Sequence, residues 1–218
     1  MEALSNLLQP YKEEVGVTAS VVTILQFFSG TFICYDIYKR KSTNGIGALP
    51  FIGGVVIGIL VLKFSMILQD KNMFNVNVAA ILLNTIYLAF YIFYSKNKME
   101  EVFRPCLKGS ALIVVLLSYV AYEDPNNLEY RYGLIVTVLM LLLMGSPLIE
   151  IKSMIKNEDA SAIPFPLTLM GTIVSFLWLL YGIILLNSFM VVQNILGFLL
   201  CVVQLALSIM YPLKVKFE

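Results

Sequence analysis

Seven long apolar segments constrain this chain more than any other feature of its sequence. A bilayer core about 30 Å thick is crossed by roughly 20 helical residues at about 1.5 Å each, which is close to the length of these segments. Of the 218 residues, 59% are hydrophobic and 13% are charged, whereas a soluble domain averages about 25% charged residues. The composition excludes a soluble enzyme, a disordered chain and a disulfide-stapled scaffold. The predicted spans cover 16–38, 48–69, 73–95, 106–122, 132–152, 164–186 and 189–211.

The lysines and arginines orient these spans. Loops rich in basic residues face the cytosol, and the asymmetry predicts an N-terminus outside and a C-terminus in the cytosol. An odd number of spans is needed for that result. One set of loops holds Lys39, Arg40, Lys41, Lys96, Lys98, Arg104, Lys108, Lys152, Lys156, Lys214 and Lys216. The opposite set holds Lys12, Lys71 and Arg131, while Lys63 lies inside a span.

The two halves of the chain share a pattern of spacings. Asn77 lies 47 residues after Gly30, and Asn194 lies 47 residues after Pro147. Each asparagine falls early in the third helix of its half. Because a single helix separates the two triplets, the second triplet enters the membrane from the same side as the first. Such parallel repeats are one plan of membrane transporters, with the substrate site near mid-membrane where the halves meet.

The predicted fold is therefore an all-α membrane protein with seven transmembrane helices, arranged as two parallel three-helix repeats joined by a connecting helix. The lipid bilayer is its first expected partner. The predicted parts are an extracellular N-terminus (1–15), the first repeat (16–95), a connector with helix 4 (96–131), the second repeat (132–211) and a cytosolic tail (212–218).

Asn77 and Asn194 are the first candidates for a substrate site. A carboxamide offers two donor hydrogens and one acceptor oxygen, which suits a sugar hydroxyl that both gives and accepts a hydrogen bond. A hydrogen bond between helices is the alternative role for a membrane asparagine. Two asparagines at equivalent repeat positions favour the substrate site.

Trp178, the only tryptophan, is the next candidate. It lies some 14 residues, roughly 21 Å, into its helix, which is too deep for the inner aromatic belt. The indole offers a flat face to the C–H side of a sugar ring, and the alternatives are a packed core aromatic or an outer-belt anchor. The matching place in the first repeat, sixteen residues before Asn77, holds Val61. The predicted pocket therefore has a tryptophan on one side and a valine on the other.

Gly30, Pro50, Pro147 and Pro164 are candidate hinge positions. A proline removes a helix donor and fixes a bend. Pro50 and Pro164 lie near the starts of their spans, where a proline is also tolerated as an ordinary first-turn residue. Pro147 lies within the fifth span, and Gly30 takes the matching place in the first. We expect these four positions to form a cytoplasm-side hinge about which the halves rock.

The residue types that are missing also constrain function. The chain has no histidine, and no acidic residue falls at mid-membrane, where proton- or ion-driven transporters normally carry one. The sequence therefore predicts passive movement of a neutral solute, with no enzyme activity, cofactor or metal site. A net charge of +1 gives no reason to expect a nucleic-acid partner.

Several of these features together resemble the SWEET, or saliva, family of sugar transporters. The features are the three-one-three helices, the Ser146-Pro147-Leu148 run, Pro164, Trp178, the Tyr181-Gly182 pair, Asn77 and Asn194. The resemblance covers nearly the whole chain, from about Gly16 to Tyr211, and the length looks like that of an animal member. It implies facilitated, bidirectional diffusion of mono- or disaccharides by alternating access.

The resemblance also implies roles for single residues. Asn77 and Asn194 match the family's sugar-contacting asparagines, Trp178 matches its pocket tryptophan, and the three prolines match its hinge prolines. Gly30 departs from the family by replacing the first-span proline, and Val61 stands at the other pocket wall. Members often associate through their membrane faces, which makes a homo-oligomer an expectation. The plasma membrane and the Golgi are both expected locations.

Two other functions compete with this interpretation. A PQ-loop-type lysosomal amino-acid exporter has a similar architecture, but it typically shows Pro-Gln pairs and a proton-linked acidic residue, and this chain lacks both. A seven-span receptor or membrane scaffold is the alternative from a different class, and it would move no solute in liposomes.

Overall fold

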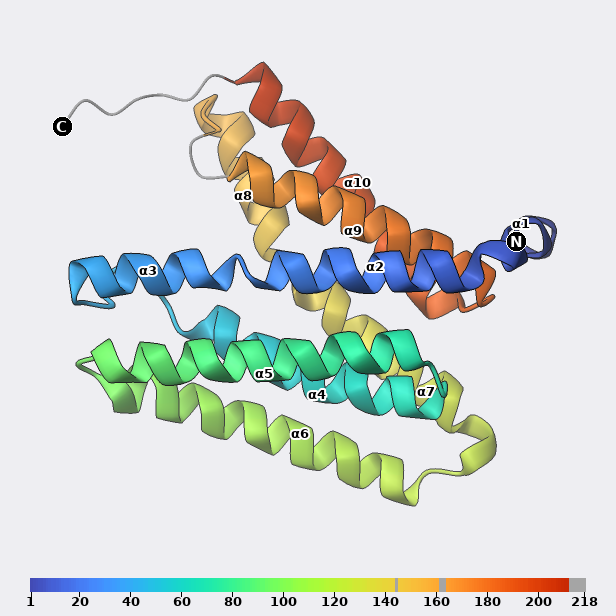
Figure 1. Cartoon of the computed structure of the whole chain (residues 1–218). Coiled ribbons are helices and arrows are strands. Elements are labelled where there is room, and N and C mark those ends of the chain that lie inside the picture. The colour runs from blue at the N-terminus through green and yellow to red at the C-terminus, as the bar shows by residue number, and fades with distance from the viewer. Residues whose placement is uncertain (144, 161–163, 212–218) are drawn as a thin grey trace. The chain divides into compact units, whose positions relative to one another are not determined.

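The computed structural model describes residues 1–143, 145–160 and 164–211, apart from the side chains of 145–147 (Figure 1). The described residues are helical except for short turns. The helices of the first half are α1 (Glu2–Leu8), η1 (Gln9–Tyr11), α2 (Lys12–Phe27), α3 (Gly30–Arg40), α4 (Leu49–Ile67) and α5 (Lys71–Tyr94). Those that follow are η2 (Met99–Phe103), α6 (Arg104–Tyr122), α7 (Pro125–Leu143), α8 (Gly145–Asn157), α9 (Phe165–Ile184) and α10 (Ser188–Met210).

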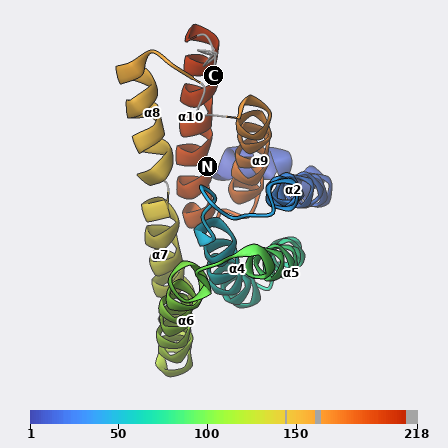
Figure 2. The ribbon, with the colours of Figure 1, turned by 90° about the vertical axis from the view of Figure 1, so that its left-hand side faces the viewer.

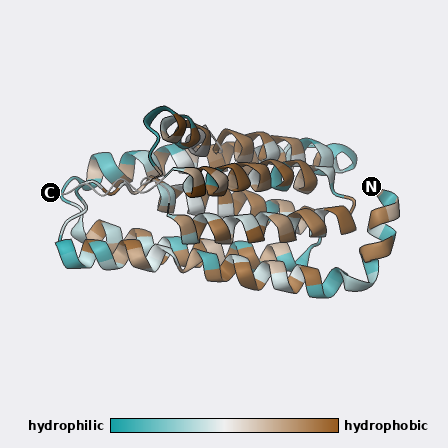
Figure 3. Cartoon of the chain, turned by 90° about the horizontal axis from the view of Figure 1, so that it is seen from above, coloured by the Kyte–Doolittle hydropathy of each residue, from teal (hydrophilic) through white to brown (hydrophobic). Residues whose placement is uncertain are grey.

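The described residues contain seven helical stretches long and apolar enough to cross a membrane. Four of them are single helices, α4, α5, α9 and α10, and the stretch Met99–Tyr122 joins η2 to α6. The first stretch (Glu2–Arg40) and the fifth (Pro125–Asn157) each combine more than one helix. Colouring by hydropathy places apolar residues along most of the helix lengths (Figure 3). The predicted all-α, seven-span fold is confirmed.

The chain divides into two compact units that do not coincide with the sequence repeats. Unit 1 contains Met1–Val22 and Thr137–Glu218, and unit 2 contains Thr23–Val136. Spans 1 and 5 therefore each contribute their start to one unit and their end to the other. The predicted bounds of the repeats, 16–95 and 132–211, stay a prediction, and the predicted tail, 212–218, lies outside the described residues.

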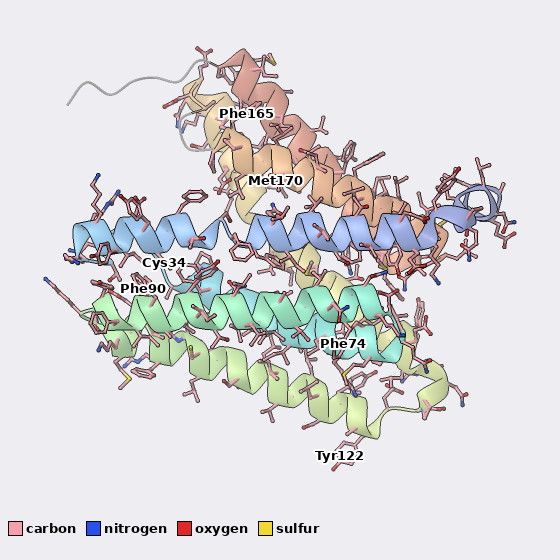
Figure 4. The ribbon with its side chains drawn as sticks, viewed as in Figure 1. Cys34, Phe74, Phe90, Tyr122, Phe165 and Met170 are labelled. Carbon is pink, nitrogen blue, oxygen red and sulfur yellow. The ribbon has the colours of Figure 1, made fainter. Side chains whose placement is uncertain are left out.

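Unit 2 is built around α4 and α5, which lie side by side, with α6 packed against α4 (Figure 2). Its apolar core joins α3, α4, α5 and η2. Cys34 of α3 is buried in this core, and Phe90 of α5 packs against it; both are labelled in Figure 4. Tyr122, at the end of α6, is 92% exposed and suits the membrane–water boundary, where aromatic side chains gather.

Unit 1 is built around the α9–α10 pair, and α8 packs on α10. Its first helix, α1, packs against α9. The hydroxyl of Ser5, which is 4% exposed, donates a hydrogen bond of 2.9 Å to the carbonyl oxygen of Ile184 at the end of α9. A terminal carbonyl of a helix has no partner within its own helix, so this contact fixes the N-terminal segment, which the sequence predicts only as an extracellular N-terminus.

Candidate functional site

The α4–α5 and α9–α10 turns have the same construction, 117 residues apart. Gln69 and Leu186 both have a φ of 55°, which is uncommon for residues other than glycine. The next residue, Asp70 or Asn187, caps the following helix by accepting a hydrogen bond from the backbone N–H three residues on, at 2.8 and 3.0 Å. Such caps satisfy donors left open at a helix start. The two turns fix an offset of 117 residues between the repeats.

The candidate asparagines lie at this offset and have the same environment. The Nδ2 group of Asn77 donates to the carbonyl oxygen four residues earlier in its own helix at 2.7 Å, and Asn194 does so at 2.8 Å. Both side chains are half-buried. Neither makes a hydrogen bond to another helix within the described residues. In contrast, Gln193 donates to Thr137 of α7 at 2.7 Å. Gln193 therefore joins helices, whereas the two asparagines bond within their own helices.

Trp178 and Asn194 lie at the same depth in the α9–α10 pair. A Cβ placed on Gly182 would lie 2.9 Å from the Cβ of Met190, so these two positions touch. Trp178 is one helical turn before Gly182, and Asn194 is one turn after Met190, which brings them level in antiparallel helices. Trp178 is 9% exposed and packs edge-to-face against Tyr181, with ring centroids 5.6 Å apart. The indole is therefore packed within unit 1 rather than exposed as a platform.

Val61 and Asn77 have the corresponding places in the α4–α5 pair. A Cβ on Gly58 would lie 2.9 Å from Cγ1 of Ile81, and about one turn from this contact the helices carry Val61 and Asn77. Val61 is half-buried. The structure thus brings Trp178 and Asn194 together in unit 1, and Val61 and Asn77 together in unit 2. That the two pairs form one pocket stays a prediction.

Gly30 lies where the first span is interrupted, because α2 ends at Phe27 and α3 begins at Gly30. The hydroxyl of Tyr87 in α5 donates to the carbonyl oxygen of Phe27 at 3.2 Å. The Tyr87 ring also lies directly against Gly30, since an added Cβ would come 2.4 Å from its Cε2 atom. A tyrosine from α5 therefore packs on the interruption, and only glycine leaves room for it.

The three prolines lie in different settings. Pro50 lies in the first turn of α4, where the missing N–H costs no hydrogen bond. Pro164 is the residue before α9, with φ −75° and ψ 102°, and Pro166 takes the first-turn place. Pro147 falls near the start of α8, after α7 ends at Leu143; its side chain lies outside the described residues. The first span is thus made of consecutive helices, whereas residue 144, between α7 and α8, lies outside the described residues. A bend at Pro147 stays a prediction.

Asn84 is a further polar residue that the sequence analysis misses. Its Nδ2 group donates to the carbonyl oxygen of Ala80 at 2.8 Å, as in the two candidate asparagines. A Cβ on Gly54 of α4 would lie 2.5 Å from both Cγ and Oδ1 of Asn84. The signal that could have found it is the seven-residue step from Asn77, which returns to nearly the same helix face.

A polar cluster at the far end of α5 is also absent from the sequence analysis. The carboxylate of Glu101 in η2 accepts hydrogen bonds from the hydroxyls of Tyr91, at 3.1 Å, and Ser95, at 2.8 Å. Tyr91 is 1% exposed and also reaches the carbonyl oxygen of Ile46 at 2.8 Å. A cavity of about 520 Å³ borders the cluster and the segment before α4. The cluster ties the start of the connecting helix to the first repeat.

The α6–α7 turn carries a charged group outside the spans. Glu123 accepts a hydrogen bond from the Tyr119 hydroxyl and forms a 3.1 Å ion pair with Arg131. The Tyr119 hydrogen bond, followed by the Arg131 guanidinium, holds the pKa of the Glu123 carboxyl below its usual range, and partial desolvation opposes the shift.

Comparison with known proteins identifies the fold and the repeats. The family model described as "Sugar efflux transporter for intercellular exchange" matches residues 13–99 and 131–216. The sugar transporter SWEET1 of Drosophila pseudoobscura pseudoobscura is 29% identical over 202 residues, covering 92% of this chain and 89% of the relative. SWEET1 of Caenorhabditis elegans is 28% identical over 208 residues, covering 95% and 68%.

More distant relatives also match nearly the whole of this chain. The bidirectional sugar transporter SWEET13 of Oryza sativa subsp. japonica is 25% identical over 211 residues, covering 94% of this chain and 71% of its own length. A solved eukaryotic SWEET transporter superposes with a TM-score of 0.85 at 21% identity, over 94% of this chain and 98% of that one. Two copies of the family pattern on a seven-span helical fold place this chain in the SWEET (MtN3) family, as an integral membrane sugar transporter and not an enzyme.

Proposed function

We propose that this SWEET-family protein is a facilitative, bidirectional uniporter that moves mono- or disaccharides by alternating access. The sequence supports a passive mechanism, because it has no histidine and its spans carry no acidic residue near mid-membrane. The rice relative SWEET13 is named a bidirectional sugar transporter. With no coupled ion, the sugar gradient alone sets the direction of net flux.

The observation that supports the proposal is that Asn77 and Asn194 make the same hydrogen bond at equivalent positions of the two repeats. Each amide uses its N–H group on its own helix and leaves its oxygen to accept from a guest hydroxyl. We assign these two side chains as the sugar's hydrogen-bond partners. Trp178 and Val61, level with the asparagines, would supply the apolar walls that face the C–H surfaces of the ring.

Alternating access needs bend points, which we place at Gly30, Pro50, Pro147 and Pro164. The interruption between α2 and α3 supports the first position. Pro147 rests on the sequence, because a proline within a span removes a helix donor. An interrupted helix lacks part of its hydrogen-bond ladder, so it bends at lower cost than a continuous one. Pro50 and Pro164 would fix where α4 and α9 begin.

Sugar uptake into proteoliposomes tests the site. The purified chain is assayed with labelled D-glucose, D-galactose, D-fructose and sucrose, with and without a proton gradient. Asn77→Ala and Asn194→Ala should each abolish uptake, while Asn75→Ala, which removes an exposed amide on another face of α5, should leave it unchanged. Undiminished uptake in both variants would refute the site, and uptake that depends on the proton gradient would refute uniport.

The proposal also covers the topology, the location and the assembly of the protein. We place the N-terminus outside and the C-terminus in the cytosol, with the protein in the plasma membrane or Golgi and associated as a homo-oligomer. Epitope tags at each end of the full chain, probed in intact and permeabilised cells, test the topology and the compartment. Cross-linking in native membranes tests the assembly.

A further inference from the structure

Asn84 lies at the centre of α5, well away from either end of the span. It follows Asn77 by seven residues, which is about 10 Å along a helix and within about 20° of the same face. A polar amide this deep in a membrane helix costs free energy unless it is hydrogen-bonded. Asn77 and Asn84 therefore form a polar row along one face of α5.

The amide of Asn84 does not join helices. Its Nδ2 group donates to Ala80 of its own helix at 2.8 Å, and its oxygen has no hydrogen-bond partner among the described residues. The facing residue of α4 is Gly54, which offers no side chain to bond with. Asn84 is half-buried rather than sealed in the core. Fixed by Ala80 on one side and by Gly54 on the other, the amide keeps an acceptor oxygen in a set position.

The second repeat lacks this amide. At the offset of 117 residues, the counterpart of Asn84 is Cys201, which is half-buried. A thiol is a weak donor and a weak acceptor. The repeats are therefore matched at Asn77 and Asn194 but differ two turns further along, and any contact made by Asn84 comes from one repeat alone.

We propose that Asn84 is a specificity-determining residue, whose amide oxygen accepts a hydrogen bond from one sugar hydroxyl about 10 Å beyond Asn77 along α5. The proposal rests on the sugar transport proposed above and extends it from one matched pair of amides to a third, unmatched one. The single-sided contact would distinguish sugars by the orientation of one hydroxyl.

The test compares the wild-type chain with Asn84→Ala in proteoliposomes. Transport efficiency, the maximal rate divided by KM, is measured for D-glucose, D-galactose, D-fructose and sucrose. It is then measured for each monodeoxy form of whichever sugar is carried fastest. Loss of one hydrogen bond should lower efficiency for the parent sugar about 2- to 10-fold. For the monodeoxy form that lacks the contacted hydroxyl, Asn84→Ala should cause no further loss.

Two further variants separate contact from folding. Gly54→Ala keeps the Asn84 amide but displaces it, so it should reproduce the selective loss. Gly53→Ala, whose added Cβ meets nothing within 4 Å, serves as the matched control and should behave as wild type. An equal loss for every monodeoxy form, or no loss for any sugar, would overturn the assignment of Asn84.

The outcomes keep this proposal apart from the proposed function. If the wild-type chain carries none of the four sugars, the proposed transport and the role of Asn84 both fail. If Asn77→Ala and Asn194→Ala leave uptake intact while Asn84→Ala acts selectively, the paired-amide site fails and Asn84 stands. Loss of all uptake in the asparagine pair, with uniform loss in Asn84→Ala, refutes only the role of Asn84.

Discussion

The Gly30→Ala substitution tests how the first span is interrupted. Its new Cβ would lie 2.4 Å from Cε2 and 2.6 Å from Cδ2 of Tyr87. The Tyr87 ring cannot swing aside freely, because it is 5% exposed, packs against Phe51 at 5.8 Å, and is tethered through its hydroxyl to Phe27. The substitution should therefore force either the ring or the backbone to move.

The expected cost follows from three contributions. Overpacking in a close-packed region costs about 1–3 kcal/mol, and loss of the Tyr87 hydrogen bond adds about 0.5–1.5 kcal/mol. Alanine is favoured over glycine within a helix by about 1 kcal/mol, which offsets part of the loss. The net expectation is a destabilisation of about 0.5–3.5 kcal/mol. At about 2–4 °C per kcal/mol for a chain of this size, a central value lowers the unfolding midpoint by several degrees.

Thermal unfolding of the purified protein in detergent measures this cost. Gly53→Ala is the matched control, because its Cβ would enter open space, and it should be neutral or slightly stabilising. In a Tyr87→Leu background the Gly30→Ala penalty should largely disappear, since the clashing ring is gone. An unchanged midpoint for Gly30→Ala, or a penalty that persists without the ring, would refute the contact.

The remaining predictions concern packing and charge elsewhere in unit 2. Tyr132 is fully buried and donates a 3.0 Å hydrogen bond to a backbone carbonyl of α4, so Tyr132→Phe should cost about 0.5–1.5 kcal/mol in thermal unfolding, whereas the exposed control Tyr122→Phe should cost nothing measurable. Glu101→Gln removes the carboxylate charge that strengthens the hydrogen bonds from Tyr91 and Ser95, and it should cost about 1–2 kcal/mol in the same assay; an unchanged midpoint would argue against the cluster. Because the pKa of Glu123 is lowered in the folded protein, its stabilising contribution is present above its ordinary value of 4.5 and is lost as the pH falls through the lowered value. Tyr119→Phe should flatten that acid dependence of the unfolding midpoint, and an identical pH profile would contradict the assigned cause.

Gly30 departs from the family pattern, and the packing of Tyr87 gives a physical reason for the glycine. The resemblance identifies a glycine where the family has a proline, and the sequence alone offers only looser bending as a consequence. In the structure, Tyr87 of α5 fills the space that any Cβ, including that of proline, would need. We infer that the glycine and the tyrosine belong together, with a side chain from another helix packed on the interruption.

The seven spans, the two repeats and the equivalence of Asn77 with Asn194 can all be predicted from the amino-acid sequence. These follow from hydrophobic length and fixed spacing, which are properties of the chain in one dimension. The hydrogen-bond partner of each polar side chain, in contrast, depends on how the helices pack. Gln193 and Asn194 are neighbours of similar chemistry, yet Gln193 joins α10 to α7 while Asn194 bonds to its own helix. That difference depends on which helix lies opposite, and neither a spacing nor a composition encodes it directly.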